Sequence, residues 1–282
     1  MTMNLVLQGP GLDQARLMEL GAPARPARMH ALSSVSLRCE DVLDTPEVRA
    51  QVAAAAFAAG ADACFIAAGR SLADFKLVAM DMDSTLITIE CIDEIADMQG
   101  LKAQVSAITE AAMRGELDFA ASLTRRVALL EGLEASALER VYEERLRISP
   151  GGEAMLAAVQ AAGLKTLLVS GGFSFFTERL QRRLGLEVAH ANVLEIENGR
   201  LTGRVVGGIV DAEEKRRTVE RVCAQLGIAT KGAIVMGDGA NDLKMMGVAG
   251  LSVAFRAKPV VRAQADVALN FSGLDGILNV LG

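Results

Sequence analysis

The 282-residue sequence predicts an α/β protein with a doubly wound parallel sheet, a helical insert and a small separate N-terminal domain. From residue 75 onward, short apolar runs alternate with helical segments, which is typical of a parallel sheet covered by helices on both faces. Residues 89–147 interrupt this alternation with helical spacing alone. The first 72 residues carry a strand–helix pattern of their own.

The first block, residues 1–72, predicts a small α/β domain, which we call the N-terminal module. Its expected elements are strands at 3–7, 30–37 and 61–68 and helices at 12–20 and 46–59. Residues 69–74 predict a linker to the second domain, residues 73–282.

The second block begins with a strand at 75–80, followed by a helical insert at about 89–147. Apolar residues in the insert recur at spacings of three and four, as in Leu123, Val127 and Leu130. The insert is too long for a single crossover helix, so we expect it to form a cap over the sheet.

The alternation of strands and helices resumes after the cap. The turn signal Asn198-Gly199 lies inside an apolar pattern that is typical of a β-hairpin. The expected elements are helices at 153–162, 173–184, 212–226 and 241–247, strands at 165–169, 233–236, 250–254 and 266–269, and the hairpin at 188–207.

Composition excludes several classes of function. A 51% hydrophobic and 23% charged chain is ordinary for a globular protein with a sizeable core. The net charge of −6 and the lack of Trp argue against binding to nucleic acid or an anionic membrane. No apolar run approaches the roughly 20 residues of a membrane helix, and the start lacks the pattern of a secretion signal. The four scattered cysteines predict reduced thiols in the cytoplasm.

Two acidic clusters each follow an apolar strand. Asp81 and Asp83 end the first, and because residues two apart in an extended chain point the same way, they address one site. Asp238 and Asp242 follow the strand at 233–236. Parallel strands that end in carboxylates can share one hard cation, and Mg²⁺ suits such a site. The alternative is that these acids only cap the helices that follow.

Anion-binding groups complete the pattern. Ser170-Gly171-Gly172 ends a strand, and we expect it to open a helix and offer a hydroxyl and backbone N–H groups to a phosphate. Lys215 is expected in the first turn of a helix, where the macrodipole disfavours a cation. Taken locally, Lys215 looks like a solvated surface lysine.

These segments, in this order, resemble the haloacid dehalogenase-like (HAD) phosphatases. The resemblance covers residues 75–282. Its elements are Asp81-Met82-Asp83-Ser84-Thr85, Ser170, Lys215 and Gly237-Asp238-Gly239-Ala240-Asn241-Asp242. A narrower resemblance, to the phosphoserine phosphatase family, comes from the following segments of the cap. They are Glu90-Cys91-Ile92-Asp93-Glu94-Ile95-Ala96, Met113, and Phe119 to Val127.

The resemblance implies a Rossmann-like fold and Mg²⁺-dependent hydrolysis of O-phospho-L-serine, the last step of serine biosynthesis. Asp81 would be the nucleophile that forms an aspartyl-phosphate, and Asp83 the acid and then the base. Mg²⁺ would be held by Asp81, the Asp83 main-chain carbonyl and Asp238. Asp242 would orient Lys215 or the groups around the metal.

Substrate contacts are implied in the same way. Ser170, the Gly171 N–H and Lys215 would hold the phosphate oxygens.

In the cap, the resemblance places Glu90 at the ammonium group of the substrate and Arg126 at its carboxylate, which a guanidinium can bind with two hydrogen bonds. Met113 and Phe119 would line the apolar side, and Asn241 would lie near the phosphate.

Other functions stay open at this point. A related phosphatase or phosphotransferase would act on another small phosphate ester, such as phosphohomoserine. A non-catalytic amino-acid sensor would keep only the fold, but the intact acidic clusters and Lys215 disfavour it. His30 and His190 lie far from the motifs and are expected to be structural.

The N-terminal module is compatible with a regulatory domain of the amino-acid-binding ACT type. We count three strands where that fold has four. Regulation by serine, docking and homodimer formation are alternatives for its role.

Overall fold

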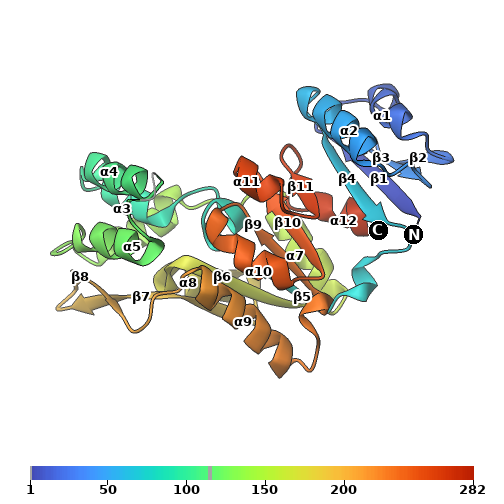
Figure 1. The fold of residues 1–282 in the computed structure, drawn as a ribbon. Helices are drawn as coiled ribbons and strands as arrows, with labels where there is room; N and C mark the ends of the chain where they lie inside the picture. Colours follow the sequence, from blue (N-terminus) through green and yellow to red (C-terminus); the bar gives the residue numbers. More distant parts are fainter. Residues whose placement is uncertain (1, 114–115) are drawn as a thin grey trace.

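The computed structural model describes residues 2–113 and 116–282, apart from the side chain of Met113, and contains two β-sheets (Figure 1). A seven-stranded sheet, here the large sheet, forms the centre of the molecule. Its strands are β5 (Leu77–Met80), β6 (Lys165–Phe173), β7 (Val188–Glu197), β8 (Arg200–Val206), β9 (Ala233–Gly237), β10 (Leu251–Phe255) and β11 (Val267–Leu269). The order is β11-β10-β9-β5-β6-β7-β8.

The strand order creates a binding position. All neighbours in the large sheet pair in parallel except β7 and β8, which form the expected antiparallel hairpin. The chain builds β6 and β7 on one side of β5 and later places β9, β10 and β11 on the other. The order therefore reverses between β5 and β9, and ligands of such sheets bind at the carboxyl ends of strands at this point.

Helices cover both faces of the large sheet, as the apolar strands predict. In β5, Val78 and Met80 belong to one buried cluster, while Leu77 and Ala79 belong to the other. Outside the insert, the helices that contribute to the first cluster are α7 (Gly152–Ala161), α8 (Ser174–Leu184) and α12 (Gly276–Leu281). Those that contribute to the second are α9 (Ala212–Gln225), α10 (Leu243–Val248) and α11 (Pro259–Arg262).

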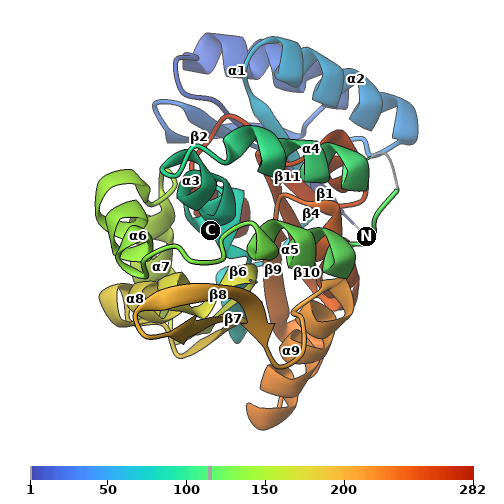
Figure 2. The ribbon, with the colours of Figure 1, turned by 90° about the vertical axis from the view of Figure 1, so that its left-hand side faces the viewer.

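The cap is helical, as expected. It contains α3 (Cys91–Asp97), α4 (Lys102–Met113), α5 (Phe119–Ala128) and α6 (Ser136–Arg140). Its two connections to the large sheet are tied together, because Ile87 and Ile148 form an antiparallel bridge. The hairpin β7–β8 extends past the end of β6, and β8 packs against α5 (Figure 2).

The N-terminal module has four strands, which corrects the count of three. Its elements are β1 (Met3–Gln8), α1 (Gln14–Gly21), β2 (Arg28–Ser33), β3 (Ser36–Glu40), α2 (Pro46–Ala58) and β4 (Asp62–Ala67), with strand order β2-β3-β1-β4. The apolar run at 30–37 contains a tight turn between β2 and β3. Hydroxyl groups form this turn, since Ser33 Oγ accepts from the Val35 N–H and contacts Ser36 Oγ at 2.7 Å.

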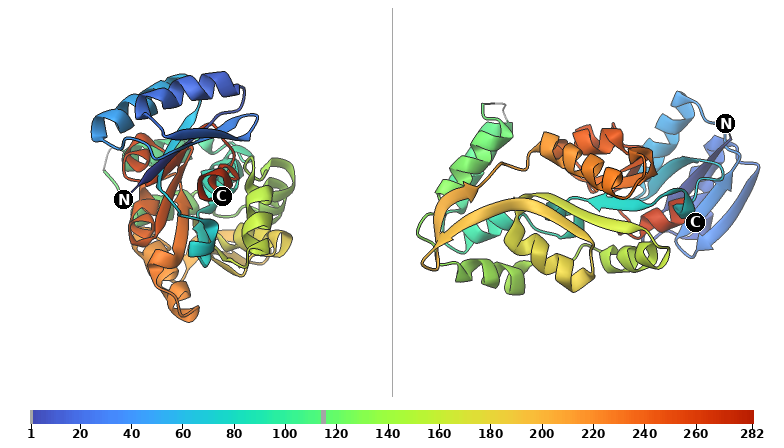
Figure 3. Two further views of the ribbon diagram at one scale, coloured as in Figure 1. Left: turned by 90° about the vertical axis from the view of Figure 1, so that its right-hand side faces the viewer. Right: turned by 90° about the horizontal axis from the view of Figure 1, so that it is seen from below.

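The N-terminal module and the cap lie at opposite ends of the large sheet (Figures 1 and 3). One face of the module's sheet is covered by α1 and α2, and Val6, Cys64 and Ile66 on the other face join the core of the large sheet. The Asp62 carboxylate accepts three backbone N–H groups after β11, from residues 270 to 272, at 2.6, 3.2 and 2.9 Å. Gln8 donates to the Gly276 carbonyl at 3.1 Å.

A few elements differ from the expectation or were not predicted. Strand β6 runs through Ser170-Gly171-Gly172 to Phe173, so this segment does not open a helix. Helices α11 and α12 were not predicted. Single helical turns lie at Ala22–Ala24, Leu72–Asp74, Val141–Arg145, Thr230–Gly232 and Ala240–Asp242.

All four cysteines are buried thiols. Within the ranges described, none of the helices is long and apolar enough to cross a membrane.

Replacing Asp62 with alanine is expected to destabilise the protein by about 2–4 kcal/mol, since three backbone N–H groups then lose a charged acceptor. Thermal unfolding should show a fall in Tm of roughly 5–10 °C. Alanine in place of the exposed Glu178 on α8 is the control and should leave Tm nearly unchanged. An equal Tm for both variants would contradict the docking role of Asp62.

Candidate active site

The site lies at the carboxyl ends of β5, β6, β9 and β10, beneath the cap. A cavity of about 600 Å³ opens there, and its walls come from both the strand ends and the cap. Nine of the residues expected from the sequence line it: Asp81, Asp83, Glu90, Phe119, Arg126, Ser170, Gly171, Asp238 and Asn241. The side chain of Met113 lies outside the described residues.

A tight loop after β5 presents the first acidic pair. The Leu86 and Ile87 N–H groups donate back to the carbonyls of Asp81 and Met82 at 3.3 and 3.0 Å. Ser84 has φ of 56°, a left-handed conformation that a non-glycine residue adopts at a cost and that is frequent at functional sites. The loop buries Asp81 and Asp83, which are 5% and 9% exposed, and both face the cavity.

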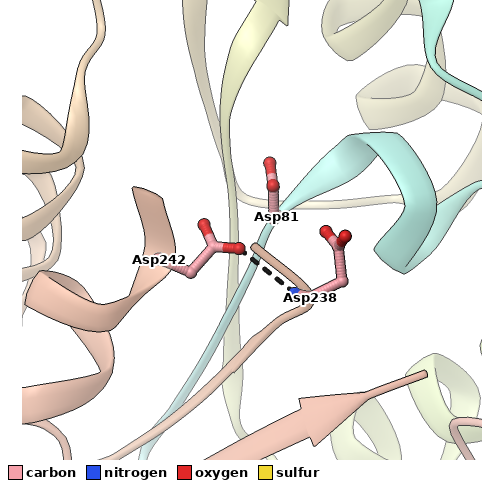
Figure 4. Close-up of side chains that lie close together, drawn as sticks. All are labelled: Asp81, Asp238 and Asp242. Carbon is pink, nitrogen blue, oxygen red and sulfur yellow. Dashed lines mark hydrogen bonds between the residues drawn. The ribbon is translucent and has the colours of Figure 1, made fainter. Parts of the chain in front are cut away.

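Three carboxylates converge at the switch point. One oxygen each from Asp81, Asp238 and Asp242 lies within 4.8 Å of the others (Figure 4). Asp238 and Asp242 belong to the loop after β9, as the sequence predicts. Asp81 and Asp242 are buried and Asp238 is partly buried, so the three carboxylates repel one another strongly unless positive charge is placed among them.

Lys215 supplies part of that charge. Its side chain, in the first turn of α9, is 0% exposed, and Nζ lies 2.8 Å from both Asp81 Oδ1 and Asp242 Oδ1. Burial alone would lower the pKa of Lys215, but the two carboxylates outweigh it and raise that pKa. Lys215 is thus a charged structural link between β5 and the loop after β9, and the expectation of a surface lysine from local sequence is wrong.

The two oxygens of Asp242 are both engaged. Oδ1 accepts from Lys215, and Oδ2 accepts the N–H groups of Asp238 and Gly239 at 3.2 and 3.1 Å. This approach requires glycine at 237, because a methyl group there would overlap the Asp242 carboxylate. Asp242 therefore orients the loop and Lys215, whereas Asp81 and Asp238 keep oxygens that face the shared space.

The electrostatics of the site fit a divalent cation. Burial and the Asp242 carboxylate raise the pKa of Asp81, against the effect of Lys215. Burial and the same neighbour raise the pKa of Asp238 to about 7. A cation between these oxygens would offset the repulsion, and carboxylate oxygens are the ligands that Mg²⁺ prefers.

Asp83 differs from the other acids. Its Oδ1 is buried and has no hydrogen-bond partner among the described residues. Burial, followed by the Glu90 carboxylate, raises the pKa of Asp83 to about 8. A raised pKa favours the protonated form, which is the form that a general acid needs.

The end of β6 lines the cavity next to Asp83, since a Cβ at Gly172 would lie 2.9 Å from Asp83 Oδ2. The Ser170 hydroxyl accepts the Gly172 N–H at 2.9 Å. The buried Asn192 of β7 donates to the Gly171 carbonyl at 2.8 Å and accepts the Val210 N–H at 2.8 Å, so it fixes this segment. Sequence reasoning missed Asn192, which lies inside the hairpin and belongs to no motif that we recognised.

The cap contributes charges of both signs. Glu90 precedes α3 and accepts the Ser84 hydroxyl at 2.7 Å, while Arg126 of α5 lines the cavity with its Nε buried and unpartnered within the described part of the chain. Phe119 packs on Gly171, where a Cβ would lie 2.7 Å from its ring. The cap thus rests directly on the strand end. Asp93 of α3 also lines the cavity and was not singled out from the sequence.

Comparisons with known proteins identify the family. The model of the haloacid dehalogenase-like hydrolases matches residues 78–247. A phosphoserine phosphatase from Polaromonas sp. is 58% identical over 215 residues, which are 74% of this chain and 91% of that protein.

Two solved structures extend the likeness to the N-terminal module. A HAD family hydrolase from Salmonella enterica serovar Typhi has a TM-score of 0.90 and 32% identity, covering 100% of this chain and 99% of that one. A probable phosphoserine phosphatase from Vibrio cholerae has a TM-score of 0.83 and 35% identity, covering 99% and 86%. The chain belongs to the haloacid dehalogenase-like hydrolases and, within them, to the phosphoserine phosphatase family.

Proposed function

We propose that the protein hydrolyses O-phospho-L-serine to L-serine and phosphate through an aspartyl-phosphate, as the last step of serine biosynthesis. The observation that carries the proposal is the pairing of two different carboxyl groups at one strand end. Asp81 is held by Lys215, while Asp83 has a raised pKa and a free buried oxygen. One group is positioned to attack and the other to donate a proton.

In the first step, an Asp81 oxygen attacks the phosphorus, and the bond between phosphorus and the serine oxygen breaks. Asp83 gives its proton to that oxygen, and serine leaves. In the second step, Asp83 takes a proton from water, which attacks the phosphorus and releases phosphate and the Asp81 carboxylate. Lys215, the Ser170 hydroxyl and the Gly171 N–H stabilise the negative charge on the phosphoryl oxygens.

We propose Asp81, Asp238 and the Asp83 main-chain carbonyl as the ligands of Mg²⁺. The engaged oxygens of Asp242 support a role for that residue in orientation. When bound, the ion offsets repulsion between the Asp81 carboxylate and the phosphate dianion.

Selection of the amino acid is assigned to the cap. Glu90 meets the ammonium group and Arg126 the carboxylate, with Phe119 and Met113 on the apolar side and Asn241 near the phosphate. The charges of Glu90 and Arg126, which face one cavity, support this assignment. Another small phosphate ester, such as phosphohomoserine, is the alternative substrate.

We propose residues 1–72 as an accessory domain and the cytoplasm as the location, which the four buried thiols support. Regulation by serine is one hypothesis for the accessory domain, motivated by its four-stranded sheet. Inhibition by serine with a purely competitive pattern would argue for product binding at the active site alone and against this hypothesis.

A screen of phosphorylated amino acids and sugars tests the reaction. Phosphate release should be fastest with phosphoserine, should stop when EDTA removes divalent ions, and should return with added Mg²⁺. Faster release from phosphohomoserine, or full activity in EDTA, would contradict the proposed substrate or the proposed cofactor.

Replacing Arg126 with alanine should lower kcat/KM for phosphoserine by about 10–100-fold, since a charged hydrogen-bonding partner contributes roughly 1.5–3 kcal/mol. Hydrolysis of p-nitrophenyl phosphate, which lacks the carboxylate, should change far less. Its neighbour Arg125 is exposed on the same helix and does not line the cavity, so R125A is the matched control. Equal losses of kcat/KM with both substrates would contradict the assignment of Arg126 to the substrate carboxylate.

Substitutions of Asp238 and Asp242, the two acids of the loop after β9, should have different effects, because one is a proposed metal ligand and the other a positioning residue. Asp238→Asn should raise the half-saturating Mg²⁺ concentration by about 100-fold or more, because it removes a ligand charge. Asp242→Asn should lower kcat by about 10–100-fold and shift that concentration much less than Asp238→Asn does, as expected for a residue that acts through others. Equal shifts in Mg²⁺ requirement would make Asp242 a ligand.

A further inference from the structure

We propose that Lys258 is a further substrate-binding residue, a cation at the rim of the cavity that attracts and holds the anionic ester. The inference rests on the proposed function and adds a residue that belongs to none of the motifs considered above. Lys258 follows β10, whose carboxyl end is the fourth strand end at this site. Because β10 lies next to β9 in the large sheet, the segment after β10 lies beside the loop that carries Asp238. Lys258 lines the cavity.

The backbone around Lys258 is firmly placed. The Lys258 N–H donates to the Asp238 carbonyl at 3.0 Å, which links the segment directly to the acidic loop. Ala257 before it and Val261 of α11 after it are buried in one core cluster. Arg256 adopts φ of 45°, so the chain turns sharply between β10 and this position. The side chain of Lys258 is exposed, while its attachment point is fixed.

The side chains that line the cavity carry more negative than positive charge, which makes a cation at its rim important for binding an anionic substrate. The charged side chains that line it are five acids and two bases: Asp81, Asp83, Glu90, Asp93, Asp238, Arg126 and Lys258. Lys215 is fully buried and is not among the lining residues, and its ammonium group pairs with both Asp81 and Asp242. Phosphoserine carries about two net negative charges at neutral pH. Even with Mg²⁺ between Asp81 and Asp238 and a proton on Asp83, the Glu90 and Asp93 carboxylates in the lining repel the entering ester.

Lys258 is available to offset that repulsion. Within the part of the chain that the structure describes, no carboxylate forms an ion pair with it. Its charge nevertheless reaches the site, because it opposes the rise in pKa that burial causes at Glu90 and Asp238. An exposed, unpaired ammonium group at the rim can bind the anionic substrate as it enters. Arg126 lies on the cap helix α5 and is assigned to the carboxylate.

The position predicts which kinetic parameter depends on Lys258. An exposed side chain at the rim contributes to capture and binding, and the groups that carry out bond breaking lie deeper. Its removal should therefore lower kcat/KM more than kcat, and its effect should weaken as salt screens the charge.

The test compares Lys258 with Lys76, an exposed lysine that precedes β5 at the opposite edge of the large sheet. Both substitutions to alanine change the net charge equally. K258A should lower kcat/KM for phosphoserine by about 5–20-fold at low ionic strength, K258E by more, and K258R by about 2-fold or less, with kcat within about 2-fold in each. K76A and K76E should stay within about 2-fold of wild type.

The dependence on salt distinguishes an electrostatic role of Lys258 from a structural one, because a structural defect would not change with ionic strength. The loss in K258A should shrink as NaCl rises from about 10 to 500 mM. A loss confined to kcat, a loss independent of salt, or equal effects at Lys76 and Lys258 would overturn the proposal.

Failure of the proposed function would be visible separately. If wild type with Mg²⁺ does not hydrolyse phosphoserine, the proposed substrate is wrong, and Lys258 is then judged by calorimetric titration of the protein with inorganic phosphate. Weaker phosphate binding in K258A than in K76A would support the role of Lys258 as an anion-binding residue. Equal binding in the two variants would refute it.

Discussion

The buried ammonium group of Lys215 is the interaction on which the rest of the site depends. Bringing an ammonium ion out of water costs several kcal/mol, and two carboxylates at 2.8 Å offset that cost. The same contacts hold Asp81 on β5 against the loop after β9, and Asp242 transmits the constraint to the backbone of Asp238 and Gly239. Three acids can therefore converge at a strand edge, which prepares the site for a cation and a phosphate.

The sheet order explains why these groups meet. Residues at 81, 170 and 238 are far apart in the sequence, yet β5, β6 and β9 are neighbours, so their carboxyl ends form one edge. The cap closes this edge from above, with Phe119 seated on Gly171. The proposed division of labour follows from this geometry: in our proposal the strand ends hold the groups for phosphoryl transfer, and the cap carries the charges that select the amino acid.

Much of this arrangement was predictable because apolar strands that end in acids leave a clear local pattern, as at Asp81 and Asp238. Lys215 was harder, since its charged neighbours resemble a surface helix and only the packing of α9 on the sheet buries it. Asn192 and Lys258 reach the site through strand neighbours, which local sequence does not reveal. The turn between β2 and β3 was missed because serine hydroxyls form it in place of glycine or proline.

The central claim is that Asp81 becomes covalently phosphorylated. The most direct measurement is an acid quench of the Mg²⁺-loaded protein during turnover of ³²P-labelled phosphoserine, followed by borohydride reduction and peptide mass spectrometry. An acyl phosphate on Asp81 is reduced to the corresponding alcohol, so the predicted result is homoserine at position 81 and nowhere else. Unmodified Asp81 together with protein-bound label on another residue would contradict the account.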